Sequence, residues 1–494
     1  MLCSVLELES SRIRDCRWTR FGRSIEGDLI MISTLAVSAL LVAGSQTTID
    51  VKVTIDSTKP MATMQPDALG VGVAVWDAHM VDQAIPKLLK DVGYRVIRYP
   101  GGSYADIYHW KTGTTTKGIQ GTIKPNTEFD SFMGMCQKAA STTLITVNYG
   151  TNEEGTGGAE PREAAEWVRY ANKTKKYGVK YWEIGNEVYG NGFYNGKGWE
   201  ADLHAPDTGK SEDRLKNPKL GPVAYGENVN AFIKAMKVED PTIKVGAVLC
   251  TPGGWPDGVD PDWNSNVLKT CGANIDFVVI HWYGEGKSAS EVLASTSQIP
   301  KIMSSLKETV RKYCGDRADQ IQLWMTEGDG STINMRHAGA LFAADFYSQW
   351  FANGASTVVW WNLHNGLSVD RNGIFDDQGM LSSGHSERGV QQPDANTPFP
   401  AYWGQYMFGQ FAKPGDQFLP TTSSRPELIV HAVKRGNGVR ALLINRDPDH
   451  VMRVSGVRGA RELGYGRTGR GKWSALAGSE LRIGPEEIVV VELN

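Results

Sequence analysis

The sequence Lys180–Glu187, KYWEIGNE, joins a short apolar run to an Asn-Glu pair. Seven similar runs lie between residues 68 and 361, and most are rich in β-branched residues and apolar at odd and even positions alike. That composition is typical of strands covered on both faces of a sheet. The eight predicted strands are Ala68–Trp76, Tyr94–Tyr99, Thr143–Tyr149, Lys180–Gly185, Ile243–Leu249, Ile275–Trp282, Gln320–Met325 and Ser356–Trp361.

Segments with helical periodicity lie between these strands. Pro161–Tyr177, for example, begins with proline at a favourable first helical position. The other helical segments are Met80–Val92, Phe129–Ala140, Tyr225–Val238, Pro300–Tyr313 and Met335–Phe351, with a weaker pattern around Val267. Eight strands that alternate with helices predict an α/β fold, a (β/α)8 TIM barrel.

The alternative α/β fold is an open, doubly wound sheet. Such sheets usually carry a glycine-rich phosphate loop directly after the first strand. Here Gly70 and Gly72 lie inside the first predicted strand, and no GxGxxG motif follows it, so we favour the barrel. Two of its loops, Val188–Gly221 and Asn362–Phe399, are long. Long loops after barrel strands build the active face of the fold.

The pattern changes after about Pro400, where short strands with turn signals between them predict a small antiparallel β-sandwich. Thr48–Thr58 alternates in the same way and is expected to add strands to this sandwich. The other predicted strands are Glu427–Lys434, Val439–Asn445, Met452–Val457 and Glu487–Leu493. The predicted organisation is an N-terminal extension over residues 1–46, sandwich strands over 47–66, the barrel over 67–400 and the sandwich domain over 401–494.

The N-terminal extension contains an apolar run, Ile32–Ala43, that is followed by small residues. Its length fits the core of a signal peptide better than a membrane span. We therefore expect a secreted or periplasmic protein with no stable membrane anchor. The alternative is an extension with a buried apolar segment.

Charge and cysteine usage exclude some classes of partner. The 494 residues carry a formal net charge of −3, with 52 Lys and Arg against 55 Asp and Glu. This balance lacks the basic signature of nucleic-acid-binding proteins, so no nucleic-acid partner is expected. The six cysteines show no CxxC or His-paired spacing. They predict buried thiols or one structural disulfide, and neither a metal nor another cofactor.

Two predicted strands end in carboxylates. Strand four is followed by Asn186-Glu187, and strand seven by Thr326-Glu327. The C-terminal ends of all barrel strands meet at one face, where active sites are built. Two carboxylates that face each other there, about 5–5.5 Å apart, suit a retaining glycosidase. One protonates the leaving oxygen while the other attacks the anomeric carbon.

Glu183 is an alternative to Glu187, because the expected strand end does not decide which of the two faces the site. We prefer Glu187 since it follows Asn186 at the strand tip, where Asn186 is suited to hydrogen-bond the 2-hydroxyl of a sugar. Aromatic side chains at strand ends and in the long loop after strand four are candidates to stack on sugar rings, among them Trp76, Trp361 and Trp199. A carbohydrate is thus the expected partner.

These motifs resemble the clan GH-A retaining glycoside hydrolases, whose hallmark is Asn-Glu at the end of strand four and Glu at the end of strand seven. Within the clan, the chain is most similar to the family 51 α-L-arabinofuranosidases, over about residues 48–494. The shared segments are Arg98–Gly102 (RYPGG), Tyr108–Trp110 (YHW), Val179–Glu187 (VKYWEIGNE), the helix Tyr225–Thr242 and His281–Tyr283 (HWY).

The resemblance implies a role for each matching residue. Glu187 would be the general acid/base and Glu327 the nucleophile. Arg98 would lie near Glu327 and keep it ionised. His281 and Tyr283 would line the site, with Tyr283 hydrogen-bonded to Glu327. We expect the charge of the ionised nucleophile to raise the pKa of Glu187.

The chain departs from the family pattern at three places. The first strand has Val75-Trp76 near the position of the family's glutamate, Ser103 replaces an Asn, and Gly328–Gly330 follows the nucleophile. These positions hold the sugar hydroxyls in the family, so the departures concern the identity of the sugar.

We expect an exo-acting α-L-arabinofuranosidase that acts on plant or microbial polysaccharide or oligosaccharide. The alternatives are another clan member, such as a β-xylosidase, a β-glucuronidase-like enzyme or an endoglucanase, and a catalytically silent carbohydrate-binding protein.

Overall fold

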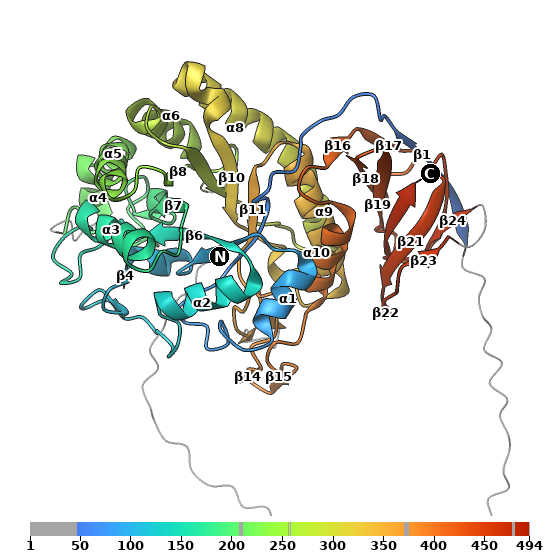
Figure 1. The fold of residues 1–494 in the computed structure, drawn as a ribbon, viewed down its shortest axis with the longest axis horizontal. Helices are drawn as coiled ribbons and strands as arrows, with labels where there is room; N and C mark the ends of the chain where they lie inside the picture. Colours follow the sequence, from blue (N-terminus) through green and yellow to red (C-terminus); the bar gives the residue numbers. More distant parts are fainter. Residues whose placement is uncertain are drawn as a thin grey trace, which may run out of the picture. The chain divides into compact units, whose positions relative to one another are not determined.

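The computed structural model describes residues 47–206, 211–254, 256, 258–369, 375–476 and 480–493, which belong to one compact unit (Figure 1). The predicted signal peptide and the N-terminal extension lie outside the described residues, so export stays a prediction. Among the described helices, none is both long and apolar enough to cross a membrane. The described cysteines are free thiols, namely Cys136, Cys250, Cys271 and Cys314.

Eight parallel strands close into a barrel, which confirms the predicted fold and excludes the open sheet. Neighbours around the barrel follow the chain order, and the last strand pairs with the first. The barrel strands are β2 (Leu69–Gly72), β3 (Val96–Tyr99), β6 (Thr142–Val147), β7 (Tyr181–Ile184), β8 (Lys244–Val248), β9 (Phe277–His281), β10 (Gln322–Glu327) and β11 (Thr357–Trp360).

Helices surround the barrel wall (Figure 1). They are α1 (Ile85–Val92), α2 (Phe129–Ala139), α3 (Pro161–Val168), α4 (Ser211–Arg214), α5 (Pro222–Glu239), α6 (Asp260–Cys271), α7 (Ala289–Ser295), α8 (Ile299–Cys314), α9 (His337–Ala352) and α10 (Pro400–Phe411). The predicted boundary at residue 400 coincides with the start of α10, which packs against α1 and α9. The chain therefore adds one more barrel helix before the sandwich strands begin.

Short elements decorate the loops. The helix α3 continues as a π-helical turn, η2 (Arg169–Thr174), within the predicted helix Pro161–Tyr177. The 3-10 helices are η1 (Gly102–Asp106), η3 (Val188–Gly190), η4 (Pro218–Leu220), η5 (Thr296–Gln298), η6 (Gly315–Gln320) and η7 (Ser331–Ile333). The short hairpins are β4 (Tyr108–His109) with β5 (Thr114–Thr115), β12 (Ser368–Val369) with β13 (Phe375–Asp376), and β14 (Ser386–Glu387) with β15 (Val390–Gln391).

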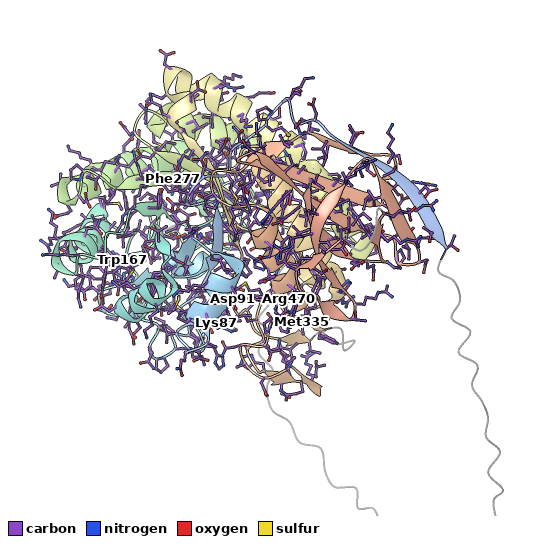
Figure 2. The ribbon with its side chains drawn as sticks, turned by 45° about the vertical axis from the view of Figure 1, so that its right-hand side comes forward. Lys87, Asp91, Trp167, Phe277, Met335 and Arg470 are labelled. Carbon is purple, nitrogen blue, oxygen red and sulfur yellow. The ribbon has the colours of Figure 1, made fainter. Side chains whose placement is uncertain are left out.

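The barrel interior is filled in layers by alternate residues of the strands. A lower, apolar layer consists of Val96, Leu144, Tyr181, Phe277, Val279 and Trp324. The rings of Phe277 and Trp324 stack with their centroids 4.5 Å apart. Phe277 is labelled in Figure 2. Side chains two positions further along a strand face the same interior. Above the apolar floor lie Arg98, Thr146, Glu183, His281 and Thr326.

Outside the wall, Trp167 of α3, also labelled in Figure 2, packs edge-on against Tyr99 and Trp182 of the strands. All three side chains are buried. Burial of such large aromatic side chains removes much apolar surface from water and stabilises the helix on the sheet. The strands β3 and β7, which lead to the predicted site, are thus held from outside as well as from inside.

The C-terminal part is a sandwich of two sheets. The first has the order β17 (Thr421–Ser423), β1 (Thr48–Ile55), β20 (Val451–Ser455), β24 (Leu481–Ile483). The second has the order β16 (Gln417–Leu419), β18 (Leu428–Arg435), β19 (Gly438–Asn445), β25 (Ile488–Leu493), β21 (Gly459–Gly466), β22 (Gly469–Arg470), and β23 (Ser474–Ala475) also pairs with β21. Val51, Val454, Leu443 and Val489 belong to the shared apolar core.

One strand pair differs from the predicted antiparallel arrangement. The strand β1 joins the sandwich as expected, but it runs parallel to β20, with Thr48 opposite Val451. The whole barrel lies between these two strands in the sequence, so no hairpin constrains their direction. The parallel pairing therefore needs no tight turn.

Candidate active site

An ionic layer lies directly above the apolar floor of the barrel. The Arg98 guanidinium on β3 donates to both carboxylate oxygens of Glu183 on β7, at 2.9 and 3.3 Å. Thr146 on β6 donates to Glu183 at 2.9 Å and Thr326 on β10 at 3.3 Å. Glu183 is fully buried. It is therefore an internal anchor for Arg98, whereas Glu187 lies beyond the strand end.

The charge of Arg98 acts on the pKa of Glu183. Burial alone raises the pKa of this carboxyl, but the Arg98 guanidinium together with His281 outweighs burial and lowers the pKa to about 2. Glu183 is thus a permanent anion near neutral pH. Both of its carboxylate oxygens are also held by donors inside the barrel, so Glu183 is not placed to give a proton to a leaving oxygen.

Glu187 and Glu327 face one small space with His281 between them. One ligand atom from each of these three side chains lies within 4.8 Å of the other two. This close approach of one oxygen from each carboxylate is compatible with the about 5–5.5 Å between carboxyl groups in retaining glycosidases.

Glu327 reaches this space through an irregularity in its strand. The register between β9 and β10 shifts between Met325 and Glu327. In a regular strand, neighbouring residues point to opposite faces, and a bulge re-aims one of them. The bulge allows Thr326 to bond Glu183 while Glu327 turns toward the site. Glu327 accepts hydrogen bonds from Arg98 at 2.9 Å and from the Tyr283 hydroxyl at 2.7 Å.

Glu187 has different partners from Glu327. Its Oε1 lies 2.9 Å from His281 Nδ1, and its Oε2 accepts a hydrogen bond of 2.7 Å from Trp199 Nε1. His281 Nε2 lies 3.2 Å from the Thr326 hydroxyl. The imidazole is thus held at both nitrogens. Trp199 comes from the long loop after β7 and fixes the second oxygen of Glu187.

The pKa values in the site differ from the prediction that Glu327 raises the pKa of Glu187. Burial alone lowers the pKa of His281, but Glu327, Glu183 and Glu187 surround it and raise that pKa to about 9. Burial also favours neutral Glu187, yet hydrogen bonding and attraction from His281 lower the pKa of Glu187. The prediction was wrong in direction because it counted the second carboxylate and left out the cation between them.

Three hydrogen bonds hold Asn186 in place. Its Oδ1 accepts from Arg98 at 2.8 Å, and its Nδ2 donates to Glu200 Oε1 at 2.7 Å. Its backbone N–H donates to Asp106 at 2.9 Å. The structure therefore brings Arg98, Asn186, Glu187, His281, Tyr283 and Glu327 into one connected network, and places there every polar residue that the sequence predicted for the site.

Two of the candidate stacking residues stand at the rim. Trp361 follows β11, is partly exposed, and packs its ring directly over Gly102, where an added Cβ would lie 2.5 Å from the ring. Trp361 Nε1 donates to Asn365 at 2.9 Å. Trp76 follows β2 and is also partly exposed. The stacking role of Trp76 stays a prediction.

Sequence reasoning missed three contributors to the network. Trp199 was expected only to stack on sugar, and Glu200 and Asp106 were not expected at the site at all. Trp199 and Glu200 lie in the long loop after β7, and loop length was the available signal. Asp106 ends η1, just after the Pro-Gly-Gly segment.

Glu187, His281 and Glu327 are also close enough together to hold a metal ion. A metal there would lie beside the Arg98 guanidinium, which contacts Glu327 at 2.9 Å, and would require a neutral imidazole. Because the surrounding carboxylates raise the pKa of His281 to about 9, a proton competes for that position. The arrangement thus fits proton transfer better than metal binding.

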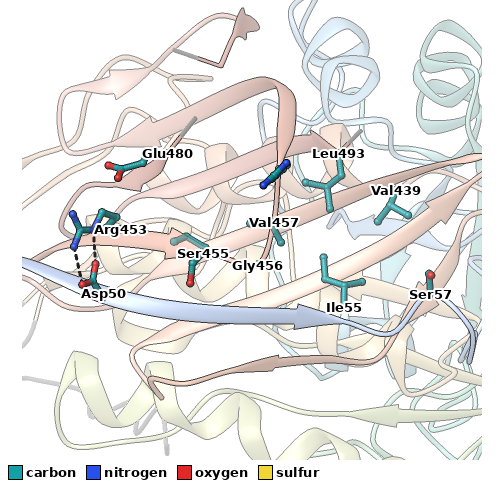
Figure 3. Close-up of a pocket in the computed structure, with 12 residues that line it drawn as sticks. Asp50, Ile55, Ser57, Val439, Arg453, Ser455, Gly456, Val457, Glu480 and Leu493 are labelled. Atoms are coloured by element: carbon teal, nitrogen blue, oxygen red, sulfur yellow. Dashed lines mark hydrogen bonds and ion pairs between the residues drawn. The ribbon is translucent and has the colours of Figure 1, made fainter. Parts of the chain in front are cut away.

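A separate cavity of about 910 Å³ lies on the sandwich (Figure 3). Arg453 pairs with Asp50 at its wall, and Figure 3 also labels Glu480 there. None of its described lining residues is aromatic. It therefore lacks the ring surface on which sugars stack, and the carboxylate pair on the barrel remains the candidate site.

No family model matches the chain. Comparison with curated proteins finds relatives that are named α-L-arabinofuranosidases. A probable α-L-arabinofuranosidase C of Aspergillus clavatus is 28% identical over 37% of this chain and 34% of its own length. The namesake from Aspergillus niger is 25% identical over 69% of this chain and 67% of its own length. The chain thus spans about a third of the length of the first curated relatives it matches.

Solved structures share the fold over nearly the whole chain. The α-L-arabinofuranosidase of Thermotoga maritima, solved with arabinose, is 16% identical, with a TM-score of 0.64 over 90% of this chain and 100% of that one. The GH51 α-L-arabinofuranosidase of Thermotoga petrophila is 17% identical, with a TM-score of 0.65 and the same coverage. The resemblance seen in the motifs is confirmed: this chain is related in sequence to α-L-arabinofuranosidases and has the fold of family 51 glycoside hydrolases.

Proposed function

We propose that this protein is a retaining glycoside hydrolase, and specifically an exo-acting α-L-arabinofuranosidase on plant or microbial polysaccharide or oligosaccharide. The observation that carries the proposal is the spacing of Glu187 and Glu327, which each bring one carboxylate oxygen within 4.8 Å of the other at the tips of β7 and β10. That spacing leaves room for an anomeric carbon but not for an additional water between substrate and base.

In the first step Glu327 attacks the anomeric carbon and the bond to the leaving oxygen breaks. Glu187 gives its proton to that oxygen, so an alcohol leaves and the sugar stays on Glu327 as an ester. In the second step Glu187 takes a proton from water, the water oxygen attacks the anomeric carbon, and Glu327 leaves as a carboxylate. The anomeric configuration is retained after two displacements.

The neighbours of each carboxylate suit these roles. Arg98 and Tyr283 both donate to Glu327, at 2.9 and 2.7 Å, and so hold its carboxylate in place for attack. His281 Nδ1 lies 2.9 Å from Glu187 and 3.7 Å from Glu327, so the imidazole interacts electrostatically with both carboxylates. Glu327 loses its negative charge when it becomes an ester, and the loss of a nearby like charge favours the ionised Glu187 that the second step needs as its base.

The choice of sugar rests on the relatives. The Aspergillus proteins are named α-L-arabinofuranosidases, and a protein of Acetivibrio thermocellus that is 23% identical over 45% of this chain is named an intracellular exo-α-(1→5)-L-arabinofuranosidase. We therefore propose the same bond class here.

The test is a panel of nitrophenyl glycosides that includes α-L-arabinofuranoside, β-xyloside, β-glucuronide and β-cellobioside. Release of nitrophenol from the arabinofuranoside, with proton NMR detecting the retained anomer first, is the expected result. A first-formed inverted anomer would rule out the double displacement. If the protein hydrolyses only another glycoside of the panel, the proposed mechanism stands and the proposed sugar specificity is wrong. Glu327→Ala serves as the inactive control.

A further inference from the structure

The loop after β7 returns to the site and brings a third carboxyl group to the Asn-Glu pair. Glu200 is 5% exposed, and its Oε1 accepts two hydrogen bonds of 2.7 Å. One donor is Asn186 Nδ2 and the other is the hydroxyl of Ser103. The preceding residue, Trp199, holds Glu187. Two consecutive loop residues, Trp199 and Glu200, therefore contact Glu187 and Asn186 respectively.

The contacts of Asn186 leave its amide only one orientation. Arg98 Nη2 can only donate, so the atom 2.8 Å from it must be Oδ1. Glu200 Oε1 accepts a hydrogen bond from the hydroxyl of Ser103, so the atom of the Asn186 amide that faces it must be the donor Nδ2. Rotation of the amide by half a turn would place two donors together at Arg98 and two acceptors together at Glu200. Nδ2 keeps a second hydrogen that Glu200 does not use.

The surroundings of Glu200 favour a neutral carboxylic acid. The two donors to its Oε1 are uncharged, and its Oε2 is buried without a hydrogen-bond partner among the described residues. Its acidic neighbours are Asp106 and Glu187. Of Asp106 and Glu200, Asp106 is better stabilised as an anion, because it accepts hydrogen bonds from the backbone N–H groups of Tyr149, Gly150 and Asn186. Burial and these two neighbours raise the pKa of Glu200 well above its ordinary value.

We propose that Glu200 is a positioning residue, which as a neutral acid fixes the side-chain amide of Asn186 so that its second Nδ2 hydrogen meets the 2-hydroxyl of the bound sugar. This role rests on the proposed glycosidase function. An interaction with the 2-hydroxyl that strengthens in the transition state lowers the barrier, and its strength depends on how well the donor is held.

Ser103 belongs to the same arrangement, because its hydroxyl is the second donor to Glu200 Oε1. Ser103 and Glu200 therefore act as one unit behind Asn186. Removal of the hydroxyl in Ser103→Ala should weaken the hold on Glu200 and have a smaller effect than loss of Glu200 itself.

Two variants separate the acceptor from the side-chain volume. Glu200→Gln keeps an oxygen for Asn186 Nδ2 and stays neutral, so it should retain at least about half of the kcat/KM. Glu200→Met fills nearly the same volume without that acceptor, and should reduce kcat/KM by about tenfold to hundredfold, as expected for a misplaced catalytic contact. Glu285→Met, an exposed glutamate two residues beyond Tyr283, is the matched control and should behave as wild type.

Two further measurements distinguish positioning from mere structural support. In a double-mutant cycle, Glu200→Met should add little to Asn186→Ala, since the first change acts through the second residue. A 2-deoxy-2-fluoro glycoside lacks the hydroxyl, so the rate at which it traps Glu327 should change by less than about threefold in Glu200→Met.

Three results would overturn the role of Glu200: equal loss in Glu200→Gln and Glu200→Met, no loss in either, or additive losses with Asn186→Ala. If Glu200→Met does not fold, loss of activity in folded Glu200→Gln overturns the role, and the cycle is run with Ser103→Ala. A wild-type protein that cleaves no glycoside of the panel would instead remove the proposed function, and the role of Glu200 with it.

Discussion

At the residue scale, two glutamates four positions apart in one strand-loop segment have different roles. Glu183 lies inside the barrel, where Arg98 lowers its pKa to about 2, and Glu187 lies beyond the strand end beside His281. The separation follows from the strand itself, since β7 ends at Ile184. The same residue type is thus a fixed charge at position 183 and the proposed proton donor at position 187.

Substitution of Glu187 should depend on the leaving group. In Glu187→Ala, hydrolysis of an aryl arabinofuranoside with a poor leaving group should fall by about 10²–10⁴-fold, because general acid catalysis of that size is lost. With a dinitrophenolate leaving group, which departs without a proton, formation of the ester on Glu327 should be nearly unchanged. Burst kinetics with both substrates measure this. An equal loss on both would contradict the acid role of Glu187.

Substitution of Glu183 should act on stability. In Glu183→Gln, the buried Arg98 loses its principal counter-charge, which should lower the free energy of unfolding by about 3 kcal/mol. Urea denaturation followed by tryptophan fluorescence measures the change. The exposed Glu285→Gln is the control and should remain within about 0.5 kcal/mol of wild type. A Glu183→Gln protein as stable as this control would show that Glu183 is not the anchor.

The raised pKa of His281 predicts a pH dependence of stability. Its pKa is 6.5 ordinarily and about 9 in the folded protein, so the folded state holds a proton that the unfolded state releases. This contribution is complete below about pH 6.5 and is lost as the pH rises to about 9. The free energy of unfolding of wild type should therefore fall over that range, and the His281→Gln curve should be flatter. Parallel curves for the two proteins would contradict a protonated His281.

At the element scale, the loop segments that follow the strands set the geometry of the rim. Gly102 begins η1 with a φ of +50°, and Trp361 after β11 packs its ring over the bare Cα. The strands β3 and β11 are therefore linked at their tips through a residue without a side chain. The sequence predicted both segments, but the contact between them arises only when β11 closes the barrel.

Gly102→Ala tests this contact. The added Cβ would lie 2.5 Å from the Trp361 ring and must displace it, in addition to the strain of a positive φ. We expect a loss of about 2 kcal/mol in stability together with a lower kcat/KM. Gly118→Ala is the matched control, because its φ is +83° and nothing lies within 4 Å of the added Cβ. It should show the backbone strain alone and unchanged kinetics.

At the scale of the whole molecule, a buried polar contact connects the barrel to the sandwich. His431 on β18 contacts Asp345 on α9 at 2.7 Å, and Thr296 donates to the other oxygen of Asp345 at 2.7 Å. Asp345 is 2% exposed. Its pKa lies below the ordinary value, because hydrogen bonding and charge from His431 outweigh burial. The carboxylate thus depends on a partner from the sandwich.

Removal of that partner should destabilise the protein without changing its chemistry. In His431→Leu, Asp345 keeps only weaker bonds, and the free energy of unfolding should fall by about 1–3 kcal/mol. The kcat/KM of the folded protein should equal that of wild type, since no residue of the carboxylate pair is touched. The exposed His385→Leu is the control for loss of a histidine. A change in kcat/KM would indicate that the sandwich takes part in substrate binding.

The sequence by itself determined the barrel, the strand order and the two catalytic candidates. Strand and helix patterns are local, and a carboxylate directly after a buried run must lie at the C-terminal face of a barrel. Arg98, His281 and Tyr283 were expected at the site from the resemblance to the family 51 α-L-arabinofuranosidases.

Only the tertiary structure decided the electrostatics and the support of the site. The pKa of Glu187 is lowered because His281, from another strand, lies 2.9 Å away, and no spacing in the sequence encodes that distance. Glu200 reaches Asn186 through a loop whose path depends on packing. The parallel pairing of β1 with β20 joins segments about 400 residues apart, because β-sheet partners are chosen by packing and not by order in the chain.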